Sequence, residues 1–189
     1  MMAKDVKVTK MKKMQANKHA YNYNIKRSHD AVKFIIIHYT GIDNDTAQAE
    51  GNFFAKTNTR SAGAHFFVDR KGNIVKSVDL NRVAWSVGGK KYANKGGKLY
   101  GIANNSNSVS IEMCDCSHNI YPSEAQIEAM VSVIKYIRKH CKNANLLIRH
   151  YDVNGKPCPG TMTDETEEGR ERWIKLKARL YHDAGLDRK

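Results

Sequence analysis

One uninterrupted apolar run limits the fold more than any other feature of this sequence. Phe34-Ile35-Ile36-Ile37 leads directly into His38 and Tyr39, and the polar segment 40–44 then ends the run. Such a run is expected of a β-strand that is buried on both faces, because both alternating rows of its side chains avoid water. The run therefore predicts a central strand that is covered on each side.

Further strands and helices alternate along the chain. The hydrophobic pattern predicts strands at 64–69, 74–78, 108–116 and 146–151, and helices at 46–56, 122–141 and 165–182. The helix at 122–141 has the strongest signal, because Ser123 and Gln126 form a capping box before an apolar stripe. A four-residue connection that contains Gly72 predicts a hairpin between the second and third strands. The sequence thus indicates a single α/β domain with a mixed central β-sheet flanked by helices.

Two segments lack such a pattern. Residues 1–30 are polar and rich in Lys, Met and Asn, so we expect a mobile arm or an irregular wrap. The predicted division is a basic arm at 1–24, one domain at 25–182 and a tail at 183–189. Residues 80–103 carry many Gly, Lys and Asn residues, and a loop of that length is uncommon unless it serves a function. It either lines a groove for a polar substrate or is a plain surface excursion.

The charge of the chain implies an anionic partner. The formal net charge is +13, and residues 1–33 hold nine Lys/Arg against two Asp. Nucleic acid, an anionic membrane or an anionic polymer such as teichoic acid would fit, and so would a solvated basic arm. No nucleic-acid partner is expected, because no zinc-finger spacing, RNA-binding aromatic motif or basic heptad accompanies the charge. No apolar run reaches the length of about 18 residues that a membrane span needs. The start also lacks a signal peptide, which predicts synthesis in the cytoplasm.

A stretch near the C-terminus has the composition of a metal site. His150 and Cys158 stand eight residues apart, at the two ends of a loop that Pro157 and Pro159 stiffen, after the apolar run Leu146-Leu147-Ile148. Zinc favours nitrogen and sulfur donors in a tetrahedral arrangement. Two ligands do not make a site, and His38 at the end of the central strand is the best candidate for a third. Two histidines and one cysteine would leave the fourth position open for water, as in catalytic zinc sites.

One acidic residue lies where charge is costly. In the predicted strand at 108–116, Val109, Ile111 and Met113 point one way, while Glu112 points the other way in the middle of the strand. Glu112 is therefore a candidate proton carrier, the alternative being the partner of a buried ion pair. His65 is expected to be packed and hydrogen-bonded, although a position near the metal is an alternative. Trp85 belongs either to the core or to a wall that contacts sugar.

Together these residues resemble a known family. The resemblance rests on His38, Val83-Ala84-Trp85, Ser110-Ile111-Glu112 and two longer segments, Ser61-Ala62-Gly63-Ala64-His65-Phe66-Phe67-Val68-Asp69 and the stretch from Arg149 to Gly160. They are similar to the zinc N-acetylmuramoyl-L-alanine amidases, a family that includes phage lysins, bacterial autolysins and peptidoglycan recognition proteins. The similarity covers about residues 25–182, and its most specific part is the histidine followed by Gly-Lys-Pro-Cys-Pro.

The resemblance implies a role for each candidate residue. His38, His150 and Cys158 match the zinc ligands, Glu112 matches the catalytic acid/base, and Lys156 matches the cation beside the metal. Lys156 would stabilise an oxyanion, unless it is simply a solvated loop lysine. One branch of the phage enzymes has a tyrosine at the position where this chain has Ala64. The role of that tyrosine therefore does not apply to this chain. Cys158 differs from the aspartate ligand of the cytoplasmic recycling amidases, which favours the lysin and autolysin side.

The implied activity is hydrolysis of peptidoglycan. The bond would be the amide between the lactyl group of N-acetylmuramic acid and L-alanine of the stem peptide, cut by zinc-activated water. The resemblance implies a phage endolysin or a bacterial autolysin that reaches the wall after lysis or by a non-classical route. Its partners would be peptidoglycan and, through the basic surface, anionic wall polymers. A recognition module of the same fold that binds peptidoglycan without cutting it is the alternative.

Overall fold

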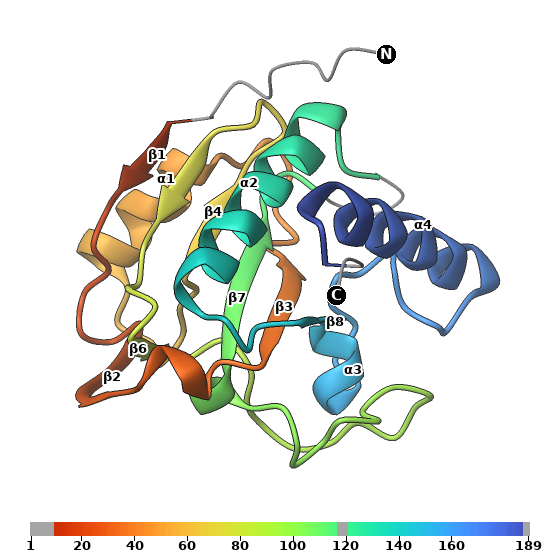
Figure 1. Cartoon of the computed structure of the whole chain (residues 1–189), viewed down its shortest axis with the longest axis horizontal. Coiled ribbons are helices and arrows are strands. Elements are labelled where there is room, and N and C mark those ends of the chain that lie inside the picture. Colours follow the sequence, from red (N-terminus) through yellow and green to blue (C-terminus); the bar gives the residue numbers. More distant parts are fainter. Residues whose placement is uncertain (1–9, 117–120, 187–189) are drawn as a thin grey trace.

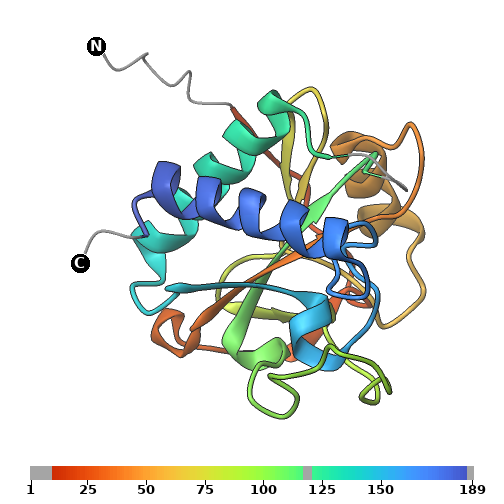
Figure 2. The ribbon, with the colours of Figure 1, turned by 90° about the vertical axis from the view of Figure 1, so that its right-hand side faces the viewer.

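A six-stranded mixed sheet runs through the middle of the molecule, with helices on both faces (Figures 1 and 2). The computed structural model describes residues 10–116 and 121–186, so the first nine residues of the expected arm and the last three of the expected tail lie outside it. The strand order is β1-β5-β4-β7-β3-β8, in which only the β4–β5 pair is antiparallel. The predicted mixed α/β fold is confirmed.

The strands of this sheet are β1 (Met11–Lys13), β3 (Phe34–Tyr39), β4 (Phe66–Val68), β5 (Ile74–Lys76), β7 (Ser108–Met113) and β8 (Leu146–Arg149). A separate antiparallel pair consists of β2 (Tyr21–Lys26) and β6 (Arg82–Ala84). The helices are α1 (Ala47–Asn52), α2 (Glu124–His140), α3 (His150–Asn154) and α4 (Glu167–Ala184), with a π-helical turn η2 (Phe53–Thr57) and 3-10 turns η1 (His29–Ala31) and η3 (Asn105–Asn107).

The main core lies between the sheet and the two long helices. Ile35, Ile37 and Ile111 point from the central strands toward α2 and α4, which contribute Ile134 and Leu176 to the same buried cluster. The alternation predicted for β7 is therefore confirmed, because Val109, Ile111 and Met113 all belong to this cluster. Glu112 consequently lies on the opposite face of the sheet.

The opposite face has two separate covers. Over β4 and β5, Phe54 of η2 stacks on Phe67 with 5.2 Å between the ring centroids. Over β3 and β8, Ile36 packs with Val153 of α3 and with Val87. Val87 lies in the segment after β6, residues 85–103, which we call the 85–103 loop. His38 and Glu112 emerge between these two covers, where they line a cavity. The arrangement of the covers thus places a polar site on an otherwise apolar sheet.

The N-terminal segment is more regular than the sequence analysis expected. Residues 11–26 contribute β1 and β2, and Ala16 and Ala20 are buried between them. Gly63 approaches this segment so closely that a Cβ atom would stand 2.5 Å from the carbonyl oxygen of Ala20. Strand β1 pairs with β5 and β2 pairs with β6, and these partners lie 50 or more residues further along the chain. For that reason no local sequence pattern predicted β1 or β2. The boundary at residue 24 stays a prediction.

Arg27 fastens the end of this segment to the domain. Its guanidinium donates to the carbonyl oxygens of Leu80, Asn105, Ser106 and Ser108 at 2.7–3.1 Å, and its Nη2 lies 3.0 Å from Nε2 of His65. Burial lowers the pKa of Arg27 to about 10, which still leaves the side chain charged at neutral pH. One side chain therefore holds together strand β2, the start of β7 and a buried histidine.

Replacing Arg27 by Met should destabilise the protein by about 3 kcal/mol, because several buried carbonyl groups lose their donor at once. The neighbouring Lys26→Met removes the same charge from an exposed position and should change stability by less than about 0.5 kcal/mol. Urea unfolding of both variants measures the difference. Equal stabilities would mean that Arg27 is not an anchor.

Candidate metal site and catalytic cleft

Three elements bring the predicted ligands together. His38 is the penultimate residue of β3, and His150 follows β8, the parallel neighbour of β3. The loop after α3 turns back so that the amide of Tyr151 donates to the carbonyl oxygen of Cys158 at 2.9 Å. That turn needs Gly155, which has a φ of +86° in the left-handed region. Side-chain donor atoms of His38, His150 and Cys158 consequently lie within 4.8 Å of one another.

The three side chains fit a metal ion. All three are buried, and Nδ1 of His38 lies 3.7 Å from Sγ of Cys158. Two such ligands on one tetrahedral zinc ion stand about 3.5 Å apart. Within the described ranges, Nε2 of His38 and both ring nitrogens of His150 have no hydrogen-bond partner. Buried polar atoms without a partner are costly, and a bound cation would satisfy those that face it.

The electrostatics of the cluster also suit a metal. Burial, followed by His150 and Lys156, lowers the pKa of His38 well below its usual value, and burial lowers the pKa of His150 to about 3. Both imidazoles are therefore neutral, the form that binds a metal. Burial raises the pKa of the Cys158 thiol, so this ligand would give up its proton only when a cation binds.

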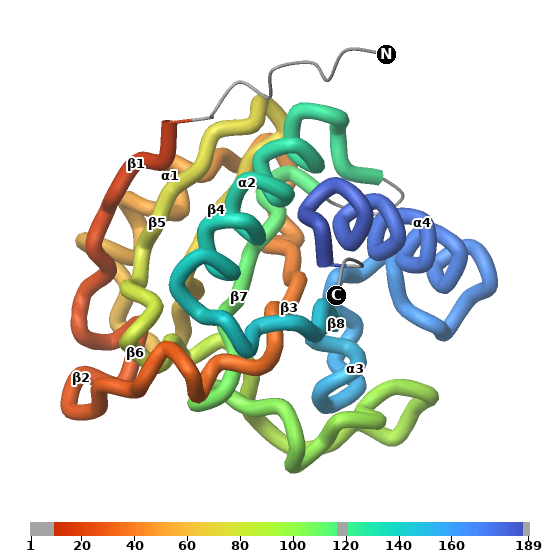
Figure 3. Tube along the Cα trace, in the orientation of Figure 1, coloured from red at the N-terminus to blue at the C-terminus, as the bar shows by residue number. Residues whose placement is uncertain are grey.

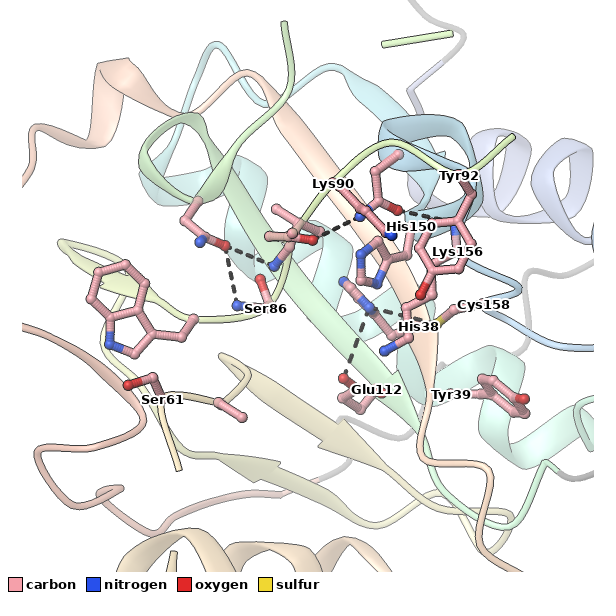
Figure 4. A pocket seen from close by; sticks show the side chains of 18 of the residues that line it. His38, Tyr39, Ser61, Ser86, Lys90, Tyr92, Glu112, His150, Lys156 and Cys158 are labelled. Carbon is pink, nitrogen blue, oxygen red and sulfur yellow. Dashed lines mark hydrogen bonds and ion pairs between the residues drawn. The ribbon is translucent and has the colours of Figure 1, made fainter. Parts of the chain in front are cut away.

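Glu112 stands beside the cluster (Figure 4). Parallel pairing of β3 with β7 sets Glu112 next to His38, and its Oε1 lies 3.9 Å from Nδ1 of that residue. Because His38 is neutral, this contact is not an ion pair. Burial first, and then the charge of Glu50, raises the pKa of Glu112 to about 8, while Lys156 opposes the rise. A carboxyl group in this position can take up and release a proton near neutral pH.

These residues line a cavity of about 730 Å³. Lys156 is exposed at its edge, and Trp85, which is half-buried, forms part of its wall. The role of Lys156 that the resemblance implied, and the role of Trp85 as a wall that contacts sugar, stay predictions. Sequence reasoning missed Tyr39, which also lines the cavity, and Glu50, which acts on Glu112 from α1. The only local signal for Tyr39 is its place after His38, and Glu50 has none.

His65 lies in the hydrogen-bond network of Arg27, and it is not a member of the ligand cluster. It is fully buried, with Nδ1 3.1 Å from Oγ of Ser110 and Nε2 3.2 Å from the carbonyl oxygen of Arg82. Burial, followed by the charge of Arg27, lowers its pKa well below the usual value. These contacts correspond to the packed and hydrogen-bonded alternative of the sequence analysis.

Fold and site together define a class. This is an α/β protein in which the carboxyl ends of parallel strands carry a His-His-Cys cluster, fit for one metal ion, beside a half-buried carboxyl group. The family model of N-acetylmuramoyl-L-alanine amidase matches residues 28–161. The chain belongs to that family.

Individual relatives support this assignment. The chain is 30% identical over 142 residues to the N-acetylmuramoyl-L-alanine amidase CwlL of Bacillus licheniformis, and 27% identical over 149 residues to CwlA of Bacillus subtilis. These matches cover 72% and 78% of this chain but 38% and 48% of those proteins, so the chain spans less than half the length of these curated relatives.

Solved structures share the fold. PlyL superposes with a TM-score of 0.69 at 19% identity, covering 91% of this chain and 97% of that one. The catalytic domain of XlyA gives 0.64 at 18% identity, covering 91% and 99%. In the described part of this chain, none of the helices combines the length and the hydropathy that crossing a bilayer requires.

Proposed function

We propose that this protein hydrolyses peptidoglycan at the amide bond between N-acetylmuramic acid and L-alanine of the stem peptide, with zinc as its cofactor. Family membership supports this activity. The observation that carries it is the cluster of His38, His150 and Cys158, whose neutral imidazoles hold unpartnered buried nitrogens beside Glu112. These three residues would hold the zinc ion.

The residues around the cluster divide the work of amide hydrolysis. When bound, zinc supplies a Lewis acid that polarises the amide carbonyl and makes water more acidic. Glu112 takes a proton from the attacking water and returns it to the leaving amine of alanine, which its raised pKa permits. Lys156 lies at the edge of the same cavity, where its ammonium group balances negative charge on the carbonyl oxygen.

Digestion of purified cell walls tests this proposal. The expected result is release of new amino groups of L-alanine without new reducing sugars. New reducing sugars alone would contradict it, because they indicate cleavage of the glycan. Binding to walls with no product at all, from zinc-loaded protein, would favour the alternative of a recognition module.

We further propose that exposed lysines of the 85–103 loop, part of which lines the cleft, attach the protein to anionic wall polymers. Lys91 and Lys95 project from the 85–103 loop, which backbone hydrogen bonds from Tyr92 and Gly97 hold against α3. The net charge of +13 supports an anionic partner.

Wall binding should therefore weaken as salt rises, because the screening length falls to about 8 Å near physiological ionic strength. The double variant Lys91→Gln/Lys95→Gln should bind less than the control Lys135→Gln/Lys139→Gln, which removes two exposed lysines of α2. Pull-down on walls with and without teichoic acid, across a salt series, measures both effects. Binding that ignores salt and teichoic acid would exclude attachment through charge.

A further inference from the structure

The cavity at the metal cluster continues in two directions. A second cavity of about 460 Å³ shares Tyr39, Glu112 and Lys156 with it. A third cavity of about 270 Å³ shares the Gly88–Gly89 rim and Asn154 with it. We call the third the outer cavity. A substrate whose cleaved bond lies at the metal cluster can therefore extend both ways.

The two extensions differ in charge. The 460 Å³ cavity includes Glu50 and Arg60 in addition to Glu112 and Lys156. Among the residues that the structure describes, none that lines the outer cavity is charged. Its walls are the apolar Val87, Ala103 and Val153, the amides Asn104 and Asn154, glycine backbone and Tyr100, which is 49% exposed.

This difference matches the two parts of the proposed substrate. A stem peptide carries carboxylates and amines, and those groups need charged partners. In a glycan of N-acetylated sugars, the sugar rings themselves carry no charge, because the charged groups belong to the attached peptides. The rings present amides, hydroxyls and apolar faces. Amide side chains and an aromatic ring are suitable partners for such a surface.

The walls of the outer cavity are held in place by the domain. Nδ2 of Asn154 donates to the carbonyl oxygen of Gly88 at 2.7 Å, and the amide of Val87 donates to Oδ1 of Asn105 at 2.8 Å. The amide of Leu99 donates to the carbonyl oxygen of Asp152 in α3 at 2.8 Å. The 85–103 loop consequently follows α3 closely (Figure 3). A preformed wall lowers the entropic cost of binding.

Gly88 and Gly89, which line both the metal-cluster cavity and the outer cavity, have no side chains. A Cβ atom at Gly88 would meet no other atom within 4 Å, so the space above this residue is open. Gly88 does not have a positive φ, so another residue can adopt its backbone conformation. A larger side chain can therefore be placed on the rim that lines both cavities, because no other atom stands close to its Cβ position.

We propose that the outer cavity binds an uncharged sugar ring of the glycan strand, the one adjacent to the muramic acid whose amide is cut. This inference rests on the proposed function and adds a subsite to it. Tyr100 supplies an aromatic face for the sugar ring, and Asn104 supplies amide hydrogen bonds. The subsite makes the enzyme prefer muramyl peptides within a glycan chain to muramyl peptides that are released from it.

Two substrates test this subsite. One is a muramyl peptide that carries a single sugar. The other has the same muramyl peptide as the middle sugar of a trisaccharide, with N-acetylglucosamine on both sides, so that either direction of the strand can fill the outer cavity. The wild-type protein should show the higher kcat/KM for the trisaccharide. Tyr100→Ala should reduce the ratio of the two values about fivefold, a typical effect of one aromatic contact.

Two further variants complete the test. Gly88→Phe should also reduce the ratio of the two kcat/KM values, because it places a ring on the rim that lines both the metal-cluster cavity and the outer cavity. Tyr23→Ala removes a tyrosine that is 62% exposed on β2, away from the cleft, and should keep the wild-type ratio. Equal kcat/KM for the two substrates in the wild-type protein, or an unchanged ratio in Tyr100→Ala, would overturn the subsite. Failure of the zinc-loaded wild-type protein to cut either substrate would instead overturn the proposed function.

Discussion

Replacing Glu112 by Gln should slow hydrolysis of cell walls by roughly 10²–10⁴-fold, the usual contribution of a positioned acid or base. Gln keeps the size of the side chain and a carbonyl acceptor, but it cannot take a proton from water. Zinc content and thermal stability should not fall, because Glu112 stands beside the ligands and is not one of them. The measurement is the lysis rate together with the zinc content of the purified variant.

Glu128→Gln serves as the control for this variant, because it makes the same chemical change at an exposed position on α2. Its lysis rate should equal that of the wild-type protein. Lysis by Glu112→Gln near the wild-type rate would assign Glu112 a structural role, and another proton carrier would be needed. Loss of zinc from Glu112→Gln would make Glu112 a ligand or the support of one.

Replacing Cys158 by Ala should remove zinc and activity together. We expect the wild-type protein to hold about one zinc ion per chain and the variant to hold almost none, because two imidazoles alone leave the site open on one side. The variant should also lose the added stability that zinc provides, since a ligand stabilises only the state that binds it. Metal analysis, lysis rate and thermal unfolding with and without added zinc measure the three effects.

Cys141→Ala is the matched control, since it also removes a buried thiol but lies in the core beneath α2 and α4. Cys141→Ala should lower the free energy of unfolding by the amount usual for a small cavity in the core. The zinc content of this variant should equal that of the wild-type protein. Equal zinc in Cys158→Ala and the wild-type protein would remove Cys158 from the site. His150→Ala should behave like Cys158→Ala, because its ring nitrogens have no other partner among the described residues.

The local sequence pattern was sufficient to predict the features that depend on a single strand or helix. The alternation in β7 identified which residues face the main core, and it thereby placed Glu112 on the other face. Ser123 marked the start of α2, where its hydroxyl accepts from the amide of Gln126. The other half of the predicted capping box is not formed, because Nε2 of Gln126 donates to the carbonyl oxygens of Val68 and Cys114 and its Oε1 has no partner among the described residues. The predicted strand and helix are also present in the folded protein, because tertiary contacts reinforce a strong local preference.

Local pattern failed where partners lie far apart in the chain. Strand β1 has three residues and no alternation, and it exists because β5 pairs with it. Strand β6 lies in a segment that the sequence analysis treated as a loop, and Arg82 and Ala84 pair with β2. Strand pairing of this kind depends on the whole sheet, so short strands with weak propensity cannot be recognised individually.

The sequence by itself determined the chemical character of the site. Two histidines and a cysteine are donor types that zinc prefers, and the spacing of His150 and Cys158 implied a loop that turns back on itself. The family resemblance implied the acid/base role of the strand glutamate and the role of the lysine as a cation beside the metal. Only the tertiary structure decided how these residues meet. Parallel pairing of β3 with both β7 and β8 sets His38 between Glu112 and His150, and the packing around them buries both histidines and leaves Glu112 half-buried at the cavity wall. Burial then keeps both imidazoles neutral and raises the pKa of Glu112 to about 8, because desolvation penalises charge, and desolvation is a property of the packed fold.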